Sequence, residues 1–290
     1  MSKENINIGI VGGGYVGNAT KLFGCVDSFD IQDVAIRVYD TDPDKCVPKQ
    51  MSIADMEDCD IVFVCVPTPM NEDGSCHLDI VESVVNDLSK VIDKSKIFIR
   101  STVPTGTSRS LGVNFMPEFL TEANWEDDFK NLKNWIVGLH DENDKQIKST
   151  IRSIFKIAKR SGRILHANVY YTSTDVAETT KLVRNTFLAT KVSFFNEIES
   201  FCKAKKLDYE VLANMVALDE RINSSHMVVP GPDGKRGFGG TCFPKDINSF
   251  LYQMQKVSLP ATILDAVIFR NEKIDRPEKD WSSDKGRAVV

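Results

Sequence analysis

A glycine-rich turn between an apolar strand and a helix constrains this chain more than any other feature. Ile6 to Val11 is a short apolar run, and Gly-Gly-Gly-Tyr-Val-Gly follows it directly. In the spacing G-x-G-x-x-G, the first glycine permits a tight turn, the second lets the backbone approach a pyrophosphate, and the third lets the helix pack on the strand. The turn comprises Gly12, Gly14 and Gly17, with Tyr15 and Val16 before the last.

A second apolar run, 34–39, ends at Asp40, which lies 23 residues past Gly17. That separation is close to the one expected for the acid that binds the hydroxyls of an adenosine ribose. A carboxylate at this position repels a 2′-phosphate, so NAD is favoured over NADP. A glycine-rich turn in another α/β fold is the alternative. The order of strand, glycines, helix, strand and acid favours a dinucleotide site with NAD as cofactor.

The first half of the chain alternates strand and helix, which predicts an α/β fold with a parallel, Rossmann-type sheet wrapped by helices. The run 60–66 is nearly all apolar, as expected for a strand covered on both faces. The predicted strands are 6–11, 34–39, 60–66, 96–101, 113–116, 135–139 and 163–166, and the predicted helices of this half are 79–92 and 143–161.

Near Thr172 the pattern changes to a helical one. A capping cluster at 172–175 precedes apolar residues at helical spacing, and no glycine or proline occurs until Pro230. A helix from about 174 to 205 would be roughly 48 Å long, so it could connect two domains or line a dimer interface. Further helices are predicted at 208–218, 248–255 and 261–271. We therefore expect an NAD-binding domain over 1–170, a helical central domain over 171–272 and an extended tail over 273–290.

Composition narrows the classes of function. With 290 residues the chain can bury a large core, and its net charge of −5 and lack of a long basic run argue against nucleic acid as a partner. No apolar segment reaches the ~18 residues of a membrane span, and the N-terminus has no apolar leader. The seven cysteines and four histidines are scattered without metal-like spacing. These features predict a cytoplasmic protein with no metal site and no membrane association.

The segment 237–246, Gly-Phe-Gly-Gly-Thr-Cys-Phe-Pro-Lys-Asp, adds a chemical centre. Pro244 suits the first turn of a helix, which would put Cys242 at the helix N-terminus. Thiols at such positions have a lowered pKa because the helix end favours an anion. Asp246, one turn on, would share the face of Cys242. This pattern predicts covalent catalysis with a proton shuttle, and a buried cysteine at a helix start is the alternative.

Short polar or proline-containing segments follow the predicted strands, at the sheet edge where such folds bind ligands. They are 66–69 (Val-Pro-Thr-Pro), 101–104 (Ser-Thr-Val-Pro) and 116–122 (Met-Pro-Glu-Phe-Leu-Thr-Glu). On the long helix, Lys181 and Asn185 are four residues apart and share a face. Each segment alone is also typical of an ordinary turn or helix surface.

Together these segments resemble the UDP-glucose/GDP-mannose dehydrogenase family. The resemblance covers VGGGYVG, PTP, STVP, PEFLTE, KLVRN and GFGGTCFPKD in family order, from residue 6 to about 273. It implies oxidation of a primary alcohol of a nucleotide sugar to a carboxylate with two NAD⁺, and a homodimer formed through the long helix. UDP-glucose is the expected sugar on family frequency.

The resemblance also implies roles for individual residues. Cys242 resembles the nucleophile that forms a thiohemiacetal and then a thioester, Lys181 and Asn185 resemble the groups that stabilise the oxyanion, and Asp246 and Thr102 resemble the pair that positions a water. Glu118 resembles the carboxylate implicated in thioester hydrolysis. The expected cofactor-binding residues outside the glycine turn are Asp40, Pro67, Thr68, Thr102 and Lys245, the last with its role open. The expected substrate-binding residues besides Lys181 are Phe119, Leu120, Glu122, Lys235, Arg236, Phe238 and Gly239.

The chain also departs from the family pattern. It ends about where the family's third domain would begin, and the loop 230–236 differs from the usual asparagine-rich approach to GFGG. Two other functions therefore stay open. One is a two-electron β-hydroxyacid-type dehydrogenase, whose superfamily also pairs a Rossmann domain with a helix that carries K-x-x-x-N. The other is a non-catalytic, NAD-binding regulatory protein.

Overall fold

The computed structural model describes residues 6–25 and 34–290. Residues 1–5 and 26–33 lie outside the described part, and so does the N-terminal segment to which the expectation of no apolar leader refers. The chain forms two compact units. The first comprises the residues up to Thr68 and Leu78–Lys181, and the second comprises Pro69–His77 and Leu182–Val290. The second unit therefore includes a short segment from the first half of the chain, which no sequence pattern indicates.

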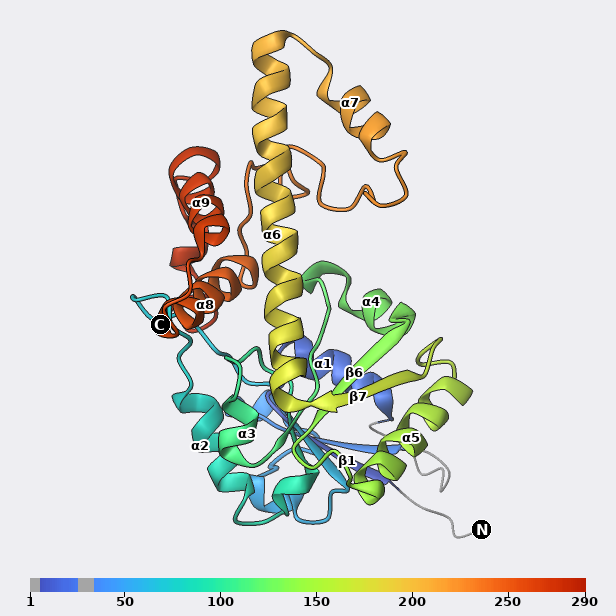
Figure 1. Ribbon diagram of the computed structural model, residues 1–290. Coiled ribbons are helices and arrows are strands. Elements are labelled where there is room, and N and C mark those ends of the chain that lie inside the picture. Colours follow the sequence, from blue (N-terminus) through green and yellow to red (C-terminus); the bar gives the residue numbers. More distant parts are fainter. Residues whose placement is uncertain (1–5, 26–33) are drawn as a thin grey trace. The chain divides into compact units, whose positions relative to one another are not determined.

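The first unit is built on a seven-stranded sheet with the order β2-β1-β3-β4-β5-β6-β7. Figure 1 labels three of its strands, β1, β6 and β7. The first five strands are parallel, β6 is antiparallel to β5, and β7 is parallel to β6. The prediction of a parallel, Rossmann-type sheet is confirmed. The strands are β1 (Ile6–Val11), β2 (Val34–Tyr39), β3 (Ile61–Val64), β4 (Ile97–Ile99), β5 (Asn114–Phe115), β6 (Asn134–Leu139) and β7 (Asn168–Ser173).

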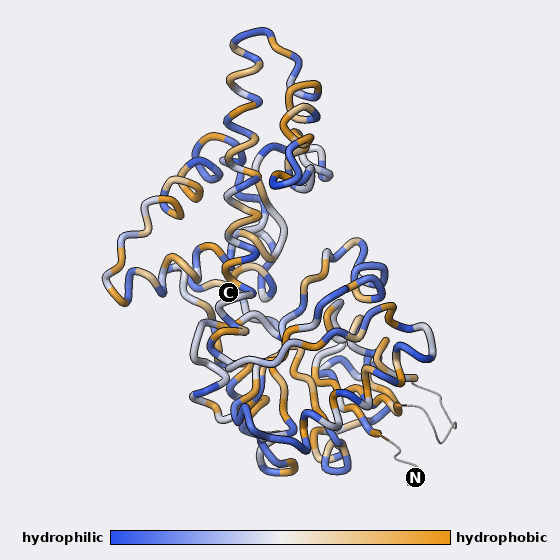
Figure 2. Tube along the Cα trace, turned by 45° about the vertical axis from the view of Figure 1, so that its right-hand side comes forward, coloured by the Kyte–Doolittle hydropathy of each residue, from blue (hydrophilic) through white to orange (hydrophobic). Residues whose placement is uncertain are grey.

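Helices cover both faces of this sheet, which is why its inner strands are mostly apolar (Figure 2). One face packs against α1 (Tyr15–Thr20), α4 (Trp125–Asn131) and α5 (Lys145–Arg160). The other face packs against α2 (Asp79–Leu88), α3 (Thr107–Leu111) and Ala177. The short helical turns of this unit are Lys21–Phe23, Pro43–Lys45, Ile53–Met56, Lys94–Lys96 and Glu122–Asn124.

The last strand of the sheet is not where the sequence predicts it. The prediction places it at 163–166, but β7 spans Asn168–Ser173. Ile164 is buried in the core as part of a connection, and the carbonyl of His166 accepts a hydrogen bond from the indole of Trp135 at 2.9 Å. As an edge strand, β7 is only half-buried, so it lacks the apolar run that marks the inner strands.

The second unit is helical. The predicted long helix is confirmed as α6 (Thr174–Lys205), which begins in the first unit and continues in the second. The other helices are α7 (Tyr209–Val216), α8 (Phe243–Lys256) and α9 (Thr262–Arg270). Their core includes Ala189, Phe238, Ile247, Leu264 and Val267. No helix in the described part of the chain has the length and apolar character needed to cross a membrane.

The expectation of an extended C-terminal tail is wrong. Asn271–Asp275 continues α9 as a π-helical turn and Asp280–Ser283 forms a 3-10 turn. Arg276 is 4% exposed and binds Asp233 and Asp280, at 2.6 and 2.7 Å. Charged residues that look solvated in the sequence are therefore paired with distant partners, and the segment packs as part of the second unit.

Candidate active site

The glycine turn has the geometry that its sequence predicts. Gly12 has a φ of +102°, which L residues rarely adopt, and its N–H donates to the carbonyl of Tyr39 at 2.9 Å. A Cβ on Gly17 would lie 1.9 Å from the carbonyl oxygen of Gly12, so only glycine lets α1 approach the turn this closely. Gly14 is exposed, and a Cβ there would meet nothing within 4 Å. A large group can therefore approach the backbone at Gly14.

Asp40 lies beside this turn at the end of β2. Its carboxylate accepts N–H bonds from Gly13 at 2.6 Å and from Asp42 at 2.8 Å, which hold it at the mouth of the turn. Pro67 and Thr68 follow β3, and Thr102 follows β4. Because β1, β3 and β4 are parallel neighbours, their carboxyl ends lie at one edge of the sheet, where the strand order reverses between β1 and β3. The structure thus brings together these predicted cofactor residues, and they fit a dinucleotide.

A buried ion pair lies at the same edge of the sheet. Lys181 and Glu118 are each 3% exposed, and Lys181 Nζ donates to Glu118 Oε1 at 2.6 Å and to the Glu118 carbonyl at 2.8 Å. The second carboxylate oxygen accepts the N–H of Leu120 at 2.8 Å. Burial alone would raise the pKa of Glu118, but the charge of Lys181, these hydrogen bonds and Arg100 outweigh it, and the net pKa is lowered.

The remaining residues of the PEFLTE segment surround this pair or extend from it. Lys181 Nζ lies 5.6 Å from the centroid of the Phe119 ring, and Leu120 is buried. Glu122 is exposed at the start of a 3-10 turn. A substrate that reaches Lys181 would therefore meet an aromatic ring and an aliphatic side chain next to the buried charges.

In the second unit, α8 begins at Phe243, as Pro244 predicts, and therefore five residues before the predicted range 248–255. Cys242 is the N-cap of this helix, Pro244 is in its first turn, and the half-buried sulfur lies 3.7 Å from the Thr241 hydroxyl. The N–H of Asp246 donates to the Cys242 carbonyl at 3.0 Å, which closes the first helical turn. The cysteine is therefore at a helix N-terminus, in a position suited to a nucleophile.

Asp246 joins the residues around this cysteine. It is 1% exposed; its Oδ2 accepts from the Asn185 amide at 2.5 Å and its Oδ1 accepts from Lys245 Nζ at 2.6 Å. Burial would lower the pKa of Lys245, but the charge of Asp246 and its hydrogen bond to Lys245 outweigh the effect of burial and raise the pKa. The predicted residues Cys242, Asn185, Lys245 and Asp246 thus form one cluster in the second unit.

The cationic loop residues predicted to bind substrate have partners within the second unit. Lys235 binds Asp280 at 2.7 Å, and Arg236 binds Glu199 and, at 3.3 Å, Asp275. Phe238 is buried and exchanges two hydrogen bonds with the side chain of Asn271, at 2.8 and 2.9 Å. A Cβ on Gly239 would lie 2.5 Å from the guanidinium carbon of Arg276. These contacts hold residues 235–239, the loop that leads into the helix α8 segment, in place.

Matches to protein families agree with this arrangement. Residues 6–159 match the UDP-glucose/GDP-mannose dehydrogenase family, NAD binding domain, and residues 175–273 match the central domain of the same family. The chain belongs to the UDP-glucose/GDP-mannose dehydrogenase family. The matched first domain implies NAD as the cofactor, in agreement with the open approach to Gly14 and the position of Asp40.

Similar proteins include a curated UDP-glucose 6-dehydrogenase and solved structures of the same fold. UDP-glucose 6-dehydrogenase TuaD of Bacillus subtilis is 30% identical over 250 residues, which are 79% of this chain and 51% of TuaD. A UDP-glucose dehydrogenase from Pyrobaculum islandicum aligns with a TM-score of 0.78 at 24% identity, over 94% of this chain and 69% of that one. A UDP-D-ManNAc dehydrogenase from Pyrococcus horikoshii aligns with a TM-score of 0.73 at 17% identity, over 92% and 68%. The chain spans about half the length of the Bacillus subtilis and Pseudomonas aeruginosa relatives it matches.

Arg100 was not predicted from the sequence as a site residue. It is fully buried beside the Glu118–Lys181 pair. It stands directly before the STVP segment, and a cation at the end of an apolar strand was the available signal. Among the described residues, no cluster of three or more His, Cys, Asp or Glu side chains could hold a metal ion.

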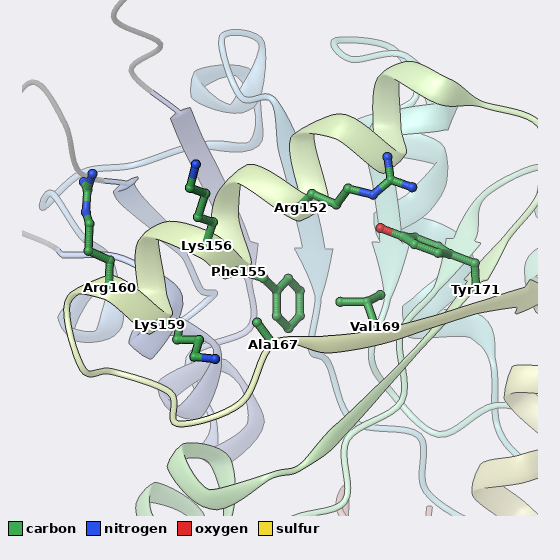
Figure 3. A pocket seen from close by; sticks show the side chains of 8 residues that line it. All are labelled: Arg152, Phe155, Lys156, Lys159, Arg160, Ala167, Val169 and Tyr171. Carbon is green, nitrogen blue, oxygen red and sulfur yellow. The ribbon is translucent and has the colours of Figure 1, made fainter.

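A pocket of about 740 Å³ lies elsewhere in the first unit, between α5 and β7 (Figure 3). Phe155 and Val169 lie between helix and strand, while Arg152 reaches over the ring of Tyr171 at 5.8 Å from its centroid. Its other lining residues are Lys156, Lys159, Arg160 and Ala167. No predicted site residue lines this pocket.

Proposed function

We propose that this chain oxidises the C6 alcohol of a nucleotide sugar to the carboxylate, with UDP-glucose as the expected substrate. The observation that carries the proposal is Cys242 at the N-terminus of α8, next to the buried Asn185–Asp246–Lys245 cluster, in a chain of this family. A simple two-electron alcohol dehydrogenase needs no such thiol. A thiol is useful when the product aldehyde must be held for a second oxidation.

The proposed reaction consists of two oxidations and a hydrolysis. Oxidation of the alcohol removes two electrons and two protons to give an aldehyde, and the Cys242 thiol adds to the aldehyde carbon as a thiohemiacetal. A second two-electron oxidation gives the thioester, whose C–S bond is broken by water to release the acid and the thiol. Bound NAD⁺ would accept the electrons of each oxidation. The residues of this chain bind the sugar, stabilise the oxygen anions and move the protons.

Lys181 and Asn185 are the proposed stabilisers of the oxyanion at the thiohemiacetal carbon. Both side chains already hold a carboxylate: Lys181 holds Glu118, and Asn185 holds Asp246. They are thus oriented before substrate binds, which lowers the reorganisation needed during the reaction. Glu118 and Asp246, with Thr102, are the proposed groups that position water and accept its proton.

The test is the yield of NADH when a limiting amount of UDP-glucose is exhausted with excess NAD⁺. We expect two NADH per sugar, and a Cys242→Ser variant that has lost steady-state turnover. Cys25→Ser, also at a half-buried cysteine, is the matched control and should keep wild-type turnover. A yield of one NADH per sugar, or full turnover by Cys242→Ser, would contradict the thioester route.

A substrate panel separates the alternatives. It should contain UDP-glucose, GDP-mannose, UDP-N-acetylhexosamines and a small 3-hydroxy acid. Oxidation of the hydroxy acid alone would favour the β-hydroxyacid-type reaction. No turnover of any compound, with ordinary iodoacetamide reactivity of Cys242, would favour a non-catalytic NAD-binding protein.

We also propose a homodimer formed through α6, in a cytoplasmic protein. Val183, Phe187, Phe194 and Phe201 are 45–65% exposed, and the three phenylalanines are spaced by seven residues, so they form one stripe along the helix. An exposed apolar stripe along one helix fits a helix-to-helix interface. The seven cysteines form no disulfide in the described chain, in keeping with a reducing compartment.

A further inference from the structure

Arg100 is a deeply buried charged residue that the proposed mechanism has not used. It follows β4 and is 1% exposed, and its guanidinium lies over the Phe63 ring at 5.6 Å from the centroid. Its Nε and Nη1 have no hydrogen-bond partner among the described residues. Burial of a guanidinium is costly unless an opposite charge compensates for the lost water. The position of Arg100 therefore calls for a nearby anion.

The sheet places that anion next to it. The N–H of Arg100 donates to the Val64 carbonyl at 2.8 Å and the N–H of Met116 donates to the Ile99 carbonyl at 2.9 Å, so Arg100 lies between the ends of β3 and β5. Glu118 lies two residues after Met116, just past the end of β5. Its negative charge acts on Arg100. Arg100 and Lys181 thus both act on this 3%-exposed carboxylate, from β4 and from α6.

One other titratable group acts in this cluster, the Cys65 thiol after β3. It is buried beside the Thr20 hydroxyl, at 3.8 Å, and burial raises its pKa to about 11. The thiol is therefore neutral at physiological pH. Among the described groups that act on one another here, Glu118 is the anion, and Arg100 and Lys181 are the cations.

We propose that Arg100 is a positioning residue that keeps Glu118 ionised when Lys181 turns to the substrate. The inference rests on the proposed function, in which Lys181 stabilises an oxyanion and Glu118 accepts a proton. Lys181 cannot pair with the Glu118 carboxylate and the substrate oxyanion equally closely at the same time. Without a second cation, the buried Glu118 would take up a proton as Lys181 left it, because burial favours the neutral acid.

Protonation of Glu118 would hinder hydrolysis of the thioester. In that step a water oxygen bonds to the thioester carbon, the water proton passes to Glu118, the C–S bond breaks, and the sulfur regains a proton as the thiol. A protonated Glu118 cannot accept the water proton. Arg100 therefore supports this step through Glu118, without contact to the substrate.

The first experiment measures the titration of the Glu118 carboxyl directly. Its side-chain carboxyl is followed by ¹³C NMR during a pH titration, with Glu118→Gln to assign the signal, in a Lys181→Met background that imitates departure of the lysine. Adding Arg100→Met should raise the titration midpoint by about one pH unit or more, because a neighbouring cation is removed. Arg100→Lys, which keeps the charge, should restore it. An unchanged midpoint after Arg100→Met would overturn the proposal.

The second experiment measures the pH dependence of the reaction rate in the enzyme with Lys181 intact. The acid limb of the pH–rate profile should move to higher pH in Arg100→Met and return in Arg100→Lys. The matched control is Arg152→Met, an exposed arginine of the same unit, which should leave the limb in place. Arg100→Gln replaces the methionine variant in both experiments if the latter does not fold.

The two readouts separate the two hypotheses. If no nucleotide sugar is oxidised, the proposed function fails, and the NMR titration alone decides whether Arg100 holds Glu118 ionised. If two NADH form per sugar but neither the midpoint nor the acid limb moves in the neutral Arg100 variants, the role of Arg100 is wrong and the function stands.

Discussion

The amide of Asn185 on α6 donates to the carboxylate of Asp246 on α8 at 2.5 Å, in a site where Asp246 is 1% exposed. This contact joins two segments 61 residues apart in the chain. It also turns the remaining oxygen of Asp246 toward Lys245, next to the cysteine. The orientation of the groups around Cys242 therefore depends on one buried carboxylate.

Asp246→Asn should destabilise the protein. The variant removes the charge that compensates for Lys245, whose side chain is only 12% exposed. Breaking a buried ion pair by removing one partner costs about 3 kcal/mol or more, because the other charge is left uncompensated. Denaturant unfolding should show this loss, and the double variant Asp246→Asn/Lys245→Met should recover part of it. Equal stability of Asp246→Asn and wild type would show that the pair is not structurally important.

Two glycine variants should separate folding from cofactor binding. Gly14→Ala has open space for its methyl group, so the free energy of unfolding should change little, while NAD affinity should fall about tenfold or more as the backbone can no longer approach the pyrophosphate. Gly17→Ala would press a methyl group onto the Gly12 carbonyl and should cost on the order of 3 kcal/mol of stability. Calorimetric titration with NAD⁺ and thermal unfolding measure the two effects. Wild-type NAD affinity in Gly14→Ala would argue against this turn as the cofactor site.

Glu178 should give the protein a pH-dependent stability. Its fully buried carboxyl accepts the N–H groups of Gly106 and Ser108 at 2.6 and 2.8 Å, and burial raises its pKa from 4.5 to about 7. The folded protein thus binds this proton more tightly than the unfolded chain does. The stabilisation is fully present below about pH 4.5 and is lost as pH rises through about 7, a change on the order of 3 kcal/mol.

Unfolding of Glu178→Gln across this pH range tests the assignment. The difference in unfolding free energy between wild type and variant should change between pH 4.5 and 8, whatever its absolute size. Glu210→Gln, at an exposed glutamate, is the control and should give a constant difference. Parallel curves for wild type and Glu178→Gln would mean that Glu178 titrates normally.

The proposed dimer can be tested on its exposed stripe. A glutamate at Phe187 or Phe194 would bury a charge in the interface, so each variant should be monomeric at concentrations where the wild type is a dimer. Light scattering after size-exclusion chromatography measures the mass. Ile263→Glu introduces the same charge at an exposed apolar residue of α9 and should stay dimeric. A monomeric wild type, or dimeric phenylalanine variants, would remove α6 as the interface.

Much of the fold could be predicted because its signals are local. The glycine turn after β1, the full extent of α6 and the start of α8 at Cys242 all follow from apolar spacing and turn chemistry within a few residues. The edge strand β7 and the folded C-terminal segment could not be predicted in the same way. Their half-buried or charged residues resemble solvated loops until the partners that cover them are known.

The order of amino acids specifies which chemical groups this protein has and, through local periodicity, the helix or strand end at which most of them lie. Which of these groups are paired depends on the fold: Lys181 pairs with Glu118, 63 residues away, Arg236 pairs with Glu199, and Arg100 lies beside the Glu118 carboxylate. The reason is that the energy of a charge depends on its distance to other charges and on its removal from water, and both are set by contacts between segments far apart in the chain.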